Sequence, residues 1–295
     1  MNTIQIDGIK IHTHVSGEQG AFVSAYLVET RRGVVAIDGT LTVTESKLHR
    51  KKLESLGKPL LGVLVTCPYP DHVAGITNLV ASDDVPIYAT RPVLELIREM
   101  EEPNRRQWEP MLKEEWVTSW TYPNRVVEDR QAITIDNVTF RVHAIGAGGE
   151  TDANCIWTLG SPPQAAFVSD LIYHGIHAYI AERHLLAWLA NLERLEALCA
   201  SCSLIFPGHG PAAAAGELLR RQRAYLLCYA AQVKELSRGR PRLTEEAKQE
   251  LTARMEAYLP GAGLSFLVAL SADTVAAELA GARWSMPAAM AAHAM

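Results

Sequence analysis

Hydrophobic and polar residues alternate along the first forty positions, the pattern expected of half-buried β-strands. The alternation runs through residues 4–12 and is interrupted by Asp7-Gly8, a dipeptide typical of a tight hairpin turn. Residues 21–29 and 34–38 form a second pair of apolar runs, joined by a short polar turn that ends at Gly33. The beginning of the chain is therefore predicted to form two consecutive hairpins.

Helical periodicity appears after residue 40 and dominates the last third of the chain. Helices are expected at residues 43–56, 73–81, 91–122, 184–198, 212–237, 243–257 and 264–281. Strands are expected at residues 60–66, 86–89, 132–135, 138–143, 153–159, 165–169 and 203–206. This order predicts an α/β fold in which two sheets lie between layers of helices. We expect one domain over residues 1–295, with its core in about 1–211 and a helical region in about 212–285.

The composition is that of an ordinary globular protein, with 48% hydrophobic and 21% charged residues in a 295-residue chain. The net charge is −5, and no stripe of lysine and arginine suggests a surface for nucleic acid. A small-molecule substrate is therefore expected, without a nucleic-acid partner. The apolar segment 264–279 could pack on the domain or form a dimer interface, which leaves monomer and homodimer open.

The cysteines and the start of the chain bear on the cellular compartment. Five cysteines make no disulfide framework, and Cys199 and Cys202 are interpreted as ordinary thiols. The first residues lack the pattern of a signal peptide, and no apolar run reaches the ~18 residues that a membrane span requires. These features favour a cytoplasmic protein that does not associate with a membrane.

Residues 61–72 are the segment that indicates chemistry most directly. An apolar strand runs into a proline-rich turn that ends with Asp71 and His72, at the start of a predicted helix whose dipole favours an ionised carboxylate. A carboxylate beside an imidazole offers two metal ligands. Further candidates follow an apolar strand or occupy a glycine-rich turn: Asp38, Glu150, Asp170 and His209.

In this order and spacing, these segments resemble the metallo-β-lactamase superfamily, whose metal-binding loop has the pattern H-x-H-x-D-H. The resemblance covers about residues 10–215, and residues 175–195 are similar to a subgroup of small-molecule hydrolases. It implies a four-layer αββα sandwich, here with additional C-terminal helices. In such a fold Asp38 is expected to tie the loop over the site.

The family's H-x-H-x-D-H pattern is degenerate in this chain. The positions of the three histidines that hold the family's first metal are occupied by Cys67, Tyr69 and Glu150. The positions that hold the second metal retain the family's residues: Asp71, His72, Asp170 and His209. The loss of one complete set beside the retention of the other predicts a mononuclear centre.

Three interpretations of the replaced positions stay open. Cys67, Tyr69 and Glu150 could leave the first site empty. They could instead be different ligands, because thiolate, phenolate and carboxylate all bind metals, with phenolate favouring iron. Alternatively, Cys67 could act as a nucleophile or Tyr69 as a general acid in metal-free chemistry.

The resemblance implies a hydrolase of a small ester, lactone, amide or thioester. Its cofactor would be one Zn²⁺, with Fe or Mn as alternatives suited to the same ligands. The candidate catalytic residues are Asp71, as a base, together with Cys67 and Tyr69. The alternatives are a metal-free protein that binds a small molecule and a lyase or isomerase.

Three residues are candidate substrate contacts. Trp108 and Trp116 lie in the aromatic segment 91–122, which could form a lid over the site. His177 lies in the turn that follows the Asp170 strand.

Overall fold

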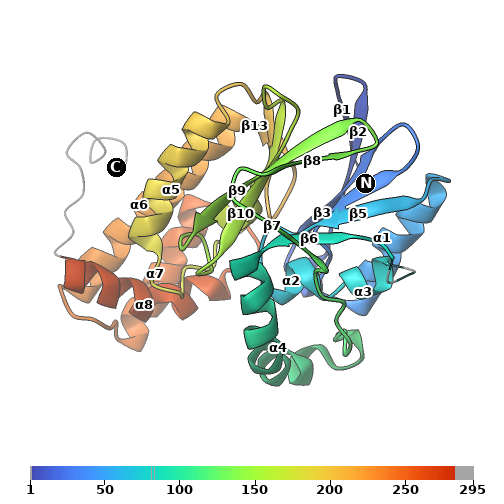
Figure 1. The fold of residues 1–295 in the computed structure, drawn as a ribbon. Coiled ribbons are helices and arrows are strands. Elements are labelled where there is room, and N and C mark those ends of the chain that lie inside the picture. Colours follow the sequence, from blue (N-terminus) through green and yellow to red (C-terminus); the bar gives the residue numbers. More distant parts are fainter. Residues whose placement is uncertain (1, 81, 83, 283–295) are drawn as a thin grey trace.

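The computed structural model describes residues 2–80, 82 and 84–282. Two β-sheets pack against each other, and helices cover the outer face of each sheet (Figure 1). Additional helices from the C-terminal part of the chain extend the helical layer that packs on the second sheet. The α/β, four-layer αββα sandwich predicted from the sequence is confirmed.

The first sheet is antiparallel at its beginning and parallel at its end. Strands β1 to β4 pair as two hairpins, and β4, β5, β6 and β7 are parallel neighbours. Parallel pairing requires crossover connections, which run through the helices on the outer face. In order across the sheet, the strands are β1 (Asn2–Ile6), β2 (Ile9–Val15), β3 (Ser24–Glu29), β4 (Val34–Ile37), β5 (Leu60–Leu64), β6 (Ile87–Thr90) and β7 (Arg125–Val127).

The second sheet has six strands, and its one parallel pair joins β11 to β12. Because parallel strands end at the same edge, the segments that follow β11 and β12 emerge side by side. In order across the sheet, the strands are β13 (Ala213–Ala214), β12 (Leu204–Phe206), β11 (Ala165–Phe167), β10 (Asn154–Leu159), β9 (Val138–Gly146) and β8 (Ala132–Ile135).

The helices divide between the two outer faces (Figure 1). Those of the first half are α1 (Val43–Ser55), α2 (Pro70–Val73), α3 (Ile76–Leu79) and α4 (Arg91–Leu112). Those of the second half are α5 (Leu185–Leu198), α6 (Ala215–Ser237), α7 (Glu245–Tyr258) and α8 (Phe266–Ala282). Residues 283–285 of the expected helical region lie outside the described residues.

Three expected helices differ from the structure. In the helix expected over 212–237, residues 213–214 form β13 and the helix begins at Ala215. Residues 73–81 do not form one helix, because the chain bends at Gly75, whose amide donates to the Thr40 carbonyl at 2.7 Å. A Cβ at Gly75 would lie 2.6 Å from Thr40 Oγ1, so this approach needs glycine. Ala81 lies outside the described residues. The helix expected over 91–122 ends at Leu112, where Lys113 adopts a φ of 52° that stops the helix.

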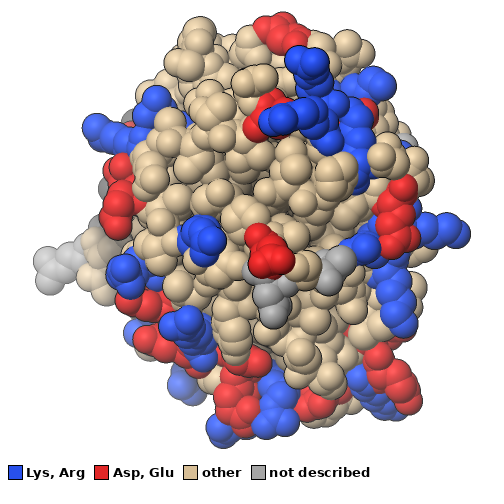
Figure 2. All heavy atoms as spheres, turned by 45° about the vertical axis from the view of Figure 1, so that its right-hand side comes forward, with Lys and Arg blue, Asp and Glu red and all other residues tan. Residues whose placement is uncertain are grey.

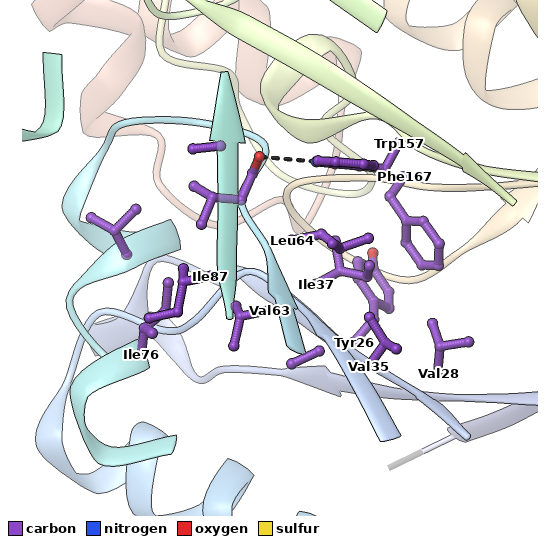
Figure 3. Close-up of a cluster of buried hydrophobic side chains, with 14 of the residues drawn as sticks. Tyr26, Val28, Val35, Ile37, Val63, Leu64, Ile76, Ile87, Trp157 and Phe167 are labelled. Carbon is purple, nitrogen blue, oxygen red and sulfur yellow. Dashed lines mark hydrogen bonds between the residues drawn. The ribbon is translucent and has the colours of Figure 1, made fainter. Parts of the chain in front are cut away.

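The contact between the sheets holds the start of the 65–72 loop in place. Figure 3 shows aliphatic side chains of the first sheet packed towards Trp157 and Phe167 of the second. The Trp157 indole donates to the Val65 carbonyl at 3.0 Å, and the Cys155 amide donates to the Thr66 carbonyl at 2.9 Å. The residues just after β5 are therefore bonded to the second sheet.

The surface carries charges of both signs. On the face in Figure 2, acidic and basic side chains lie next to one another, with uncharged surface between these groups. Within the described residues, none of the helices combines the length and apolar character needed to cross a membrane.

Candidate metal centre

Asp71, His72, Asp170 and His209 meet at one edge of the two sheets. Asp71 and His72 lie in α2, directly after the loop that follows β5. Asp170 follows β11 in a short 3-10 turn, and His209 follows the parallel neighbour β12. The topology thus brings together four residues that are up to 138 positions apart in sequence, from Asp71 to His209.

Asp38 fixes the position and tautomer of His72. The Asp38 carboxylate accepts hydrogen bonds from the Thr66 amide at 2.7 Å and the Thr66 hydroxyl at 2.5 Å. It also accepts a bond from His72 Nδ1 at 2.9 Å. With Nδ1 protonated by this contact, Nε2 of a neutral imidazole carries the lone pair, as in metal-bound histidines held by a second carboxylate. Asp38 therefore ties the loop, as the sequence led us to expect.

His209 is oriented in the same way by a backbone carbonyl. Its Nδ1 donates to the Ala21 carbonyl at 2.8 Å, and its ring stacks on Tyr173 with centroids 4.5 Å apart. The surrounding loop is anchored to β3, because the Tyr26 hydroxyl donates to the Pro207 carbonyl at 2.5 Å. His209 Nε2 is left facing the acidic residues, without a hydrogen bond of its own.

The spacing of the four side chains suits ligands of a metal ion. Asp170 Oδ1 lies 2.9 Å from His72 Nε2 and 3.3 Å from His209 Nε2, and Asp71 Oδ2 lies 3.4 Å from His209 Nε2. Two ligands at about 2.0–2.2 Å from a tetrahedral ion lie about 3.3–3.6 Å apart. The two distances from His209 Nε2 match this separation, whereas the shorter distance between His72 and Asp170 is that of a hydrogen bond. The second oxygen of Asp170, Oδ2, is buried without a hydrogen bond. The donors, their spacing around His209 and this unpartnered oxygen fit a metal.

Burial and mutual charge shift the pKa values of these groups in different directions. Burial raises the pKa of Asp71. Burial alone would raise the pKa of Asp170, but His72 and His209 hold it well below its usual range. Burial opposes charge on His72 as well, yet Asp170, Asp71 and Asp38 raise its pKa. The acidic surroundings therefore favour a positive charge at this point, on imidazole or on a metal.

At two of the replaced positions, Cys67 and Glu150, a possible ligand atom lies near those of the retained residues. The Cys67 sulfur is within 4.8 Å of ligand atoms of His72 and Asp170, and a Glu150 oxygen is within 4.8 Å of those of Asp170 and His209. Glu150 also accepts a hydrogen bond from the Tyr173 hydroxyl. Burial, with Asp170 and Glu150 nearby, raises the pKa of the Cys67 thiol, which disfavours a free thiolate nucleophile. Burial, with Glu150 and Glu182 nearby, also raises the pKa of Tyr69, so its phenol is neutral and can donate a hydrogen bond but is a weaker acid than a free phenol.

A cavity of about 320 Å³ opens onto the centre. Its floor contains Asp71, His209, Glu150, Tyr173 and Tyr69. Its walls come from the end of α4, from residues 264–267 at the start of α8, and from the segment after β2 that contains Glu18. His72 and Asp170, 0% exposed, lie behind this floor.

The three expected substrate contacts have different positions. Trp108, in α4, lines the cavity. Trp116 instead lies beyond the end of α4 and is buried in the core between the layers, away from the cavity lining. His177 is also absent from the lining, because its side chain turns to the Tyr225 hydroxyl at 3.0 Å.

Two features of the cavity were missed in the sequence. Tyr173 both stacks on His209 and bonds Glu150, and its place three residues after Asp170 was the available signal. Leu264, Phe266 and Leu267 reach the cavity through long-range packing, for which the sequence offered no local signal.

Substitution of Gly208 tests whether metal binding depends on the position of Asp170. A Cβ at residue 208 would lie 2.2 Å from Asp170 Oδ1 and 2.6 Å from the Ser169 carbonyl carbon. Gly208→Ala is expected to displace Asp170, lowering metal affinity about tenfold or more and stability by about 1–3 kcal/mol. Metal titration and urea unfolding measure the two effects.

Gly216→Ala is the matched control, because nothing lies within 4 Å of a Cβ at this helical glycine. It should leave metal affinity unchanged and should not lower stability. Equal metal affinities for the two variants would show that Asp170 is not a ligand, or that it tolerates the shift.

The comparisons with known proteins show the fold. No family model matches the chain, and neither does any curated protein. A metallo-β-lactamase from Pontibacter korlensis superposes with a TM-score of 0.58 at 20% identity, covering 76% of this chain and 98% of the other. A β-lactamase domain protein from Burkholderia ambifaria superposes with a TM-score of 0.67 at 16% identity, covering 96% of this chain and 89% of the other. The chain has the metallo-β-lactamase fold, with residues that suggest a metal.

Proposed function

We propose that the protein is a metal-dependent hydrolase of a small ester, lactone, amide or thioester, with one metal ion held by His72, Asp170 and His209. The observation that carries the proposal is the convergence of these side chains at one point, where His209 lines the floor of a cavity and His72 and Asp170 lie directly behind it. Nitrogen and oxygen donors in this number suit Zn²⁺, and also Fe or Mn. The replacement of the family's first-site histidines by Cys67, Tyr69 and Glu150 favours a single ion.

Asp71 and Asp170 differ in their position relative to the cavity. Asp170 is fully buried, whereas Asp71 lines the cavity, where a substrate and water would meet it. A catalytic zinc keeps three protein ligands and an open position. We assign the three ligand roles to His72, Asp170 and His209, and leave Asp71, which lines the cavity, to contact substrate and water.

Each residue near the centre has a separate role in the proposed hydrolysis. A divalent ion in this centre would supply Lewis-acid catalysis, polarising the substrate carbonyl and lowering the pKa of a water molecule. Asp71, with its pKa raised by burial, is placed to accept the proton of the attacking water. The neutral Tyr69 phenol, on the same floor, is placed to donate a hydrogen bond to a substrate oxygen. Asp38 holds His72 in the orientation that this arrangement requires.

Metal removal and restoration test the proposal. The protein is stripped with a chelator, and then p-nitrophenyl esters, a lactone and a thioester are assayed before and after adding Zn²⁺, Mn²⁺ or Fe²⁺. Hydrolysis of at least one substrate should fall by more than about 100-fold without metal and return on addition, since the metal contributes several kcal/mol to the barrier. Activity that is unaffected by chelation, or absent from every loaded form, would exclude the proposal.

One observation favours a second candidate, a metal-free protein that binds a small molecule. His72 Nε2 and Asp170 Oδ1 are 2.9 Å apart and form an ion pair that could occupy the centre without a metal. The same experiment separates the two, because a binding protein would bind no metal and hydrolyse none of the substrates.

A further inference from the structure

We propose that the substrate is a neutral ester or thioester whose acyl group is an apolar chain, and that the cavity discriminates against a carboxylate on that chain. This inference rests on the proposed hydrolase function and names its substrate class. It follows from the composition of the cavity walls and from the sign of the charges that line them.

The walls of the cavity are almost entirely hydrocarbon and aromatic. Helix α4 contributes Trp108, Met111 and Leu112, and the segment that begins α8 contributes Leu264, Phe266 and Leu267. Apolar walls stabilise a ligand in proportion to the apolar area that it withdraws from water. A chain that extends from the metal centre towards these helices would be enclosed along its length.

The apolar surface continues to the mouth of the cavity. Met111 is 69% exposed and Phe266 57% exposed, although both line the cavity. At about 320 Å³ the cavity is at the small end of the range of about 300–1,000 Å³ found for ligand sites. A chain of medium length therefore fits better than a large polycyclic substrate.

The lining offers an anionic substrate no cationic lysine or arginine side chain within the described residues. Glu18, Asp71 and Glu150 line the cavity, and no lysine or arginine is found among the described residues of its lining. Asp170 adds a further acidic group just behind the floor. If a divalent ion is bound, it is the one cation near the described lining that could pair with a carboxylate, and it lies at the opposite end of the chain from that group. A carboxylate on the chain would also lose its hydration among apolar side chains.

A pair of esters that differ only at the end of the chain tests the inference on the metal-loaded protein. p-Nitrophenyl hexanoate has a terminal methyl, and the mono-p-nitrophenyl ester of adipic acid has a carboxylate in its place. The neutral ester is expected to have a kcat/KM higher by about tenfold or more, because the carboxylate would lose its hydration among apolar side chains without gaining a cationic partner. Equal values for the two esters would overturn the inference.

Binding of ketones, which cannot be hydrolysed, separates this inference from the proposed function. Calorimetry on the metal-loaded protein compares 2-octanone with 7-oxooctanoate, which differ in the same terminal group. Tighter binding of 2-octanone without any ester hydrolysis would reject the hydrolase and retain the neutral, apolar ligand class. Hydrolysis of both esters at equal rates, with equal binding of both ketones, would retain the hydrolase and reject the ligand class.

A charge placed in the wall provides the matched variant pair. Phe266→Arg puts a cation in the lining, whereas Leu270→Arg places one a helical turn later on the same helix, at an exposed residue outside the lining. Phe266→Arg is expected to narrow the preference for the neutral ester by about threefold or more. Leu270→Arg should retain it. If both variants change the ratio of kcat/KM for the neutral ester to kcat/KM for the anionic ester by the same factor, the cavity wall does not set the preference for the neutral ester. Thermal unfolding verifies that both variants fold.

Discussion

Asp170→Asn is expected to abolish tight metal binding and to lower metal-dependent hydrolysis by more than about 100-fold. Asp170 Oδ1 lies within 3.3 Å of Nε2 of both imidazoles, and the second oxygen of Asp170 is buried without a hydrogen bond. Loss of groups that only support a ligand costs about 10–100-fold in metal affinity, so loss of the ligand's charge should cost more. Equilibrium dialysis with Zn²⁺ and assays of the most active ester measure the two effects.

Asp7→Asn is the matched control for the same chemical change. Asp7 occupies the exposed hairpin turn before Gly8, with a φ of 45° that asparagine also adopts readily. This variant should bind metal and hydrolyse esters like the parent protein. An Asp170→Asn variant with unchanged zinc affinity would remove Asp170 from the centre and leave the proposed ligand set untenable.

Asp38→Ala is expected to lower the free energy of unfolding by about 3 kcal/mol or more, and metal affinity by about 10–100-fold. Without the carboxylate, the Thr66 amide, the Thr66 hydroxyl and His72 Nδ1 each lose a buried hydrogen bond. Each such loss costs about 1–3 kcal/mol. Alanine also fits poorly at the φ of 57° that Asp38 adopts. Urea unfolding and metal titration give the two numbers.

Asp38→Asn separates stability from the orientation of His72. Asparagine tolerates the same backbone conformation and keeps one acceptor oxygen, so it should recover part of the stability. A neutral amide cannot strengthen His72 as a ligand as a carboxylate does, so metal affinity should stay below that of the parent protein. Parent-like metal affinity in both variants would mean that His72 does not depend on Asp38.

The local parts of the fold and site could be predicted from the sequence. The Asp7-Gly8 turn, the strand that ends in the 65–72 loop and the order of strands and helices, apart from the short strands β7 and β13, all depend on near neighbours. The four-layer sandwich followed from that order, together with the resemblance, and the structure and comparisons confirm it.

The shape of the pocket could not be predicted, because it depends on contacts between distant segments. Trp108 and Trp116 looked equivalent in the sequence, but α4 ends between them, and only Trp108 reaches the cavity. The turn that contains His177 passes near the centre, yet its imidazole turns to Tyr225 on α6. The walls from α8 meet α4 only through the packing of the two halves of the fold.

Metal stoichiometry is the most direct measurement of the proposed centre. Elemental analysis would be made on protein purified without added metal, and again after loading with excess Zn²⁺ and removal of unbound ion. One equivalent of metal per chain is expected after loading, with Asp170→Asn retaining less than about a tenth of it. Two equivalents would show that Cys67, Tyr69 or Glu150 completes a second site, and none would show that the retained residues do not hold a metal.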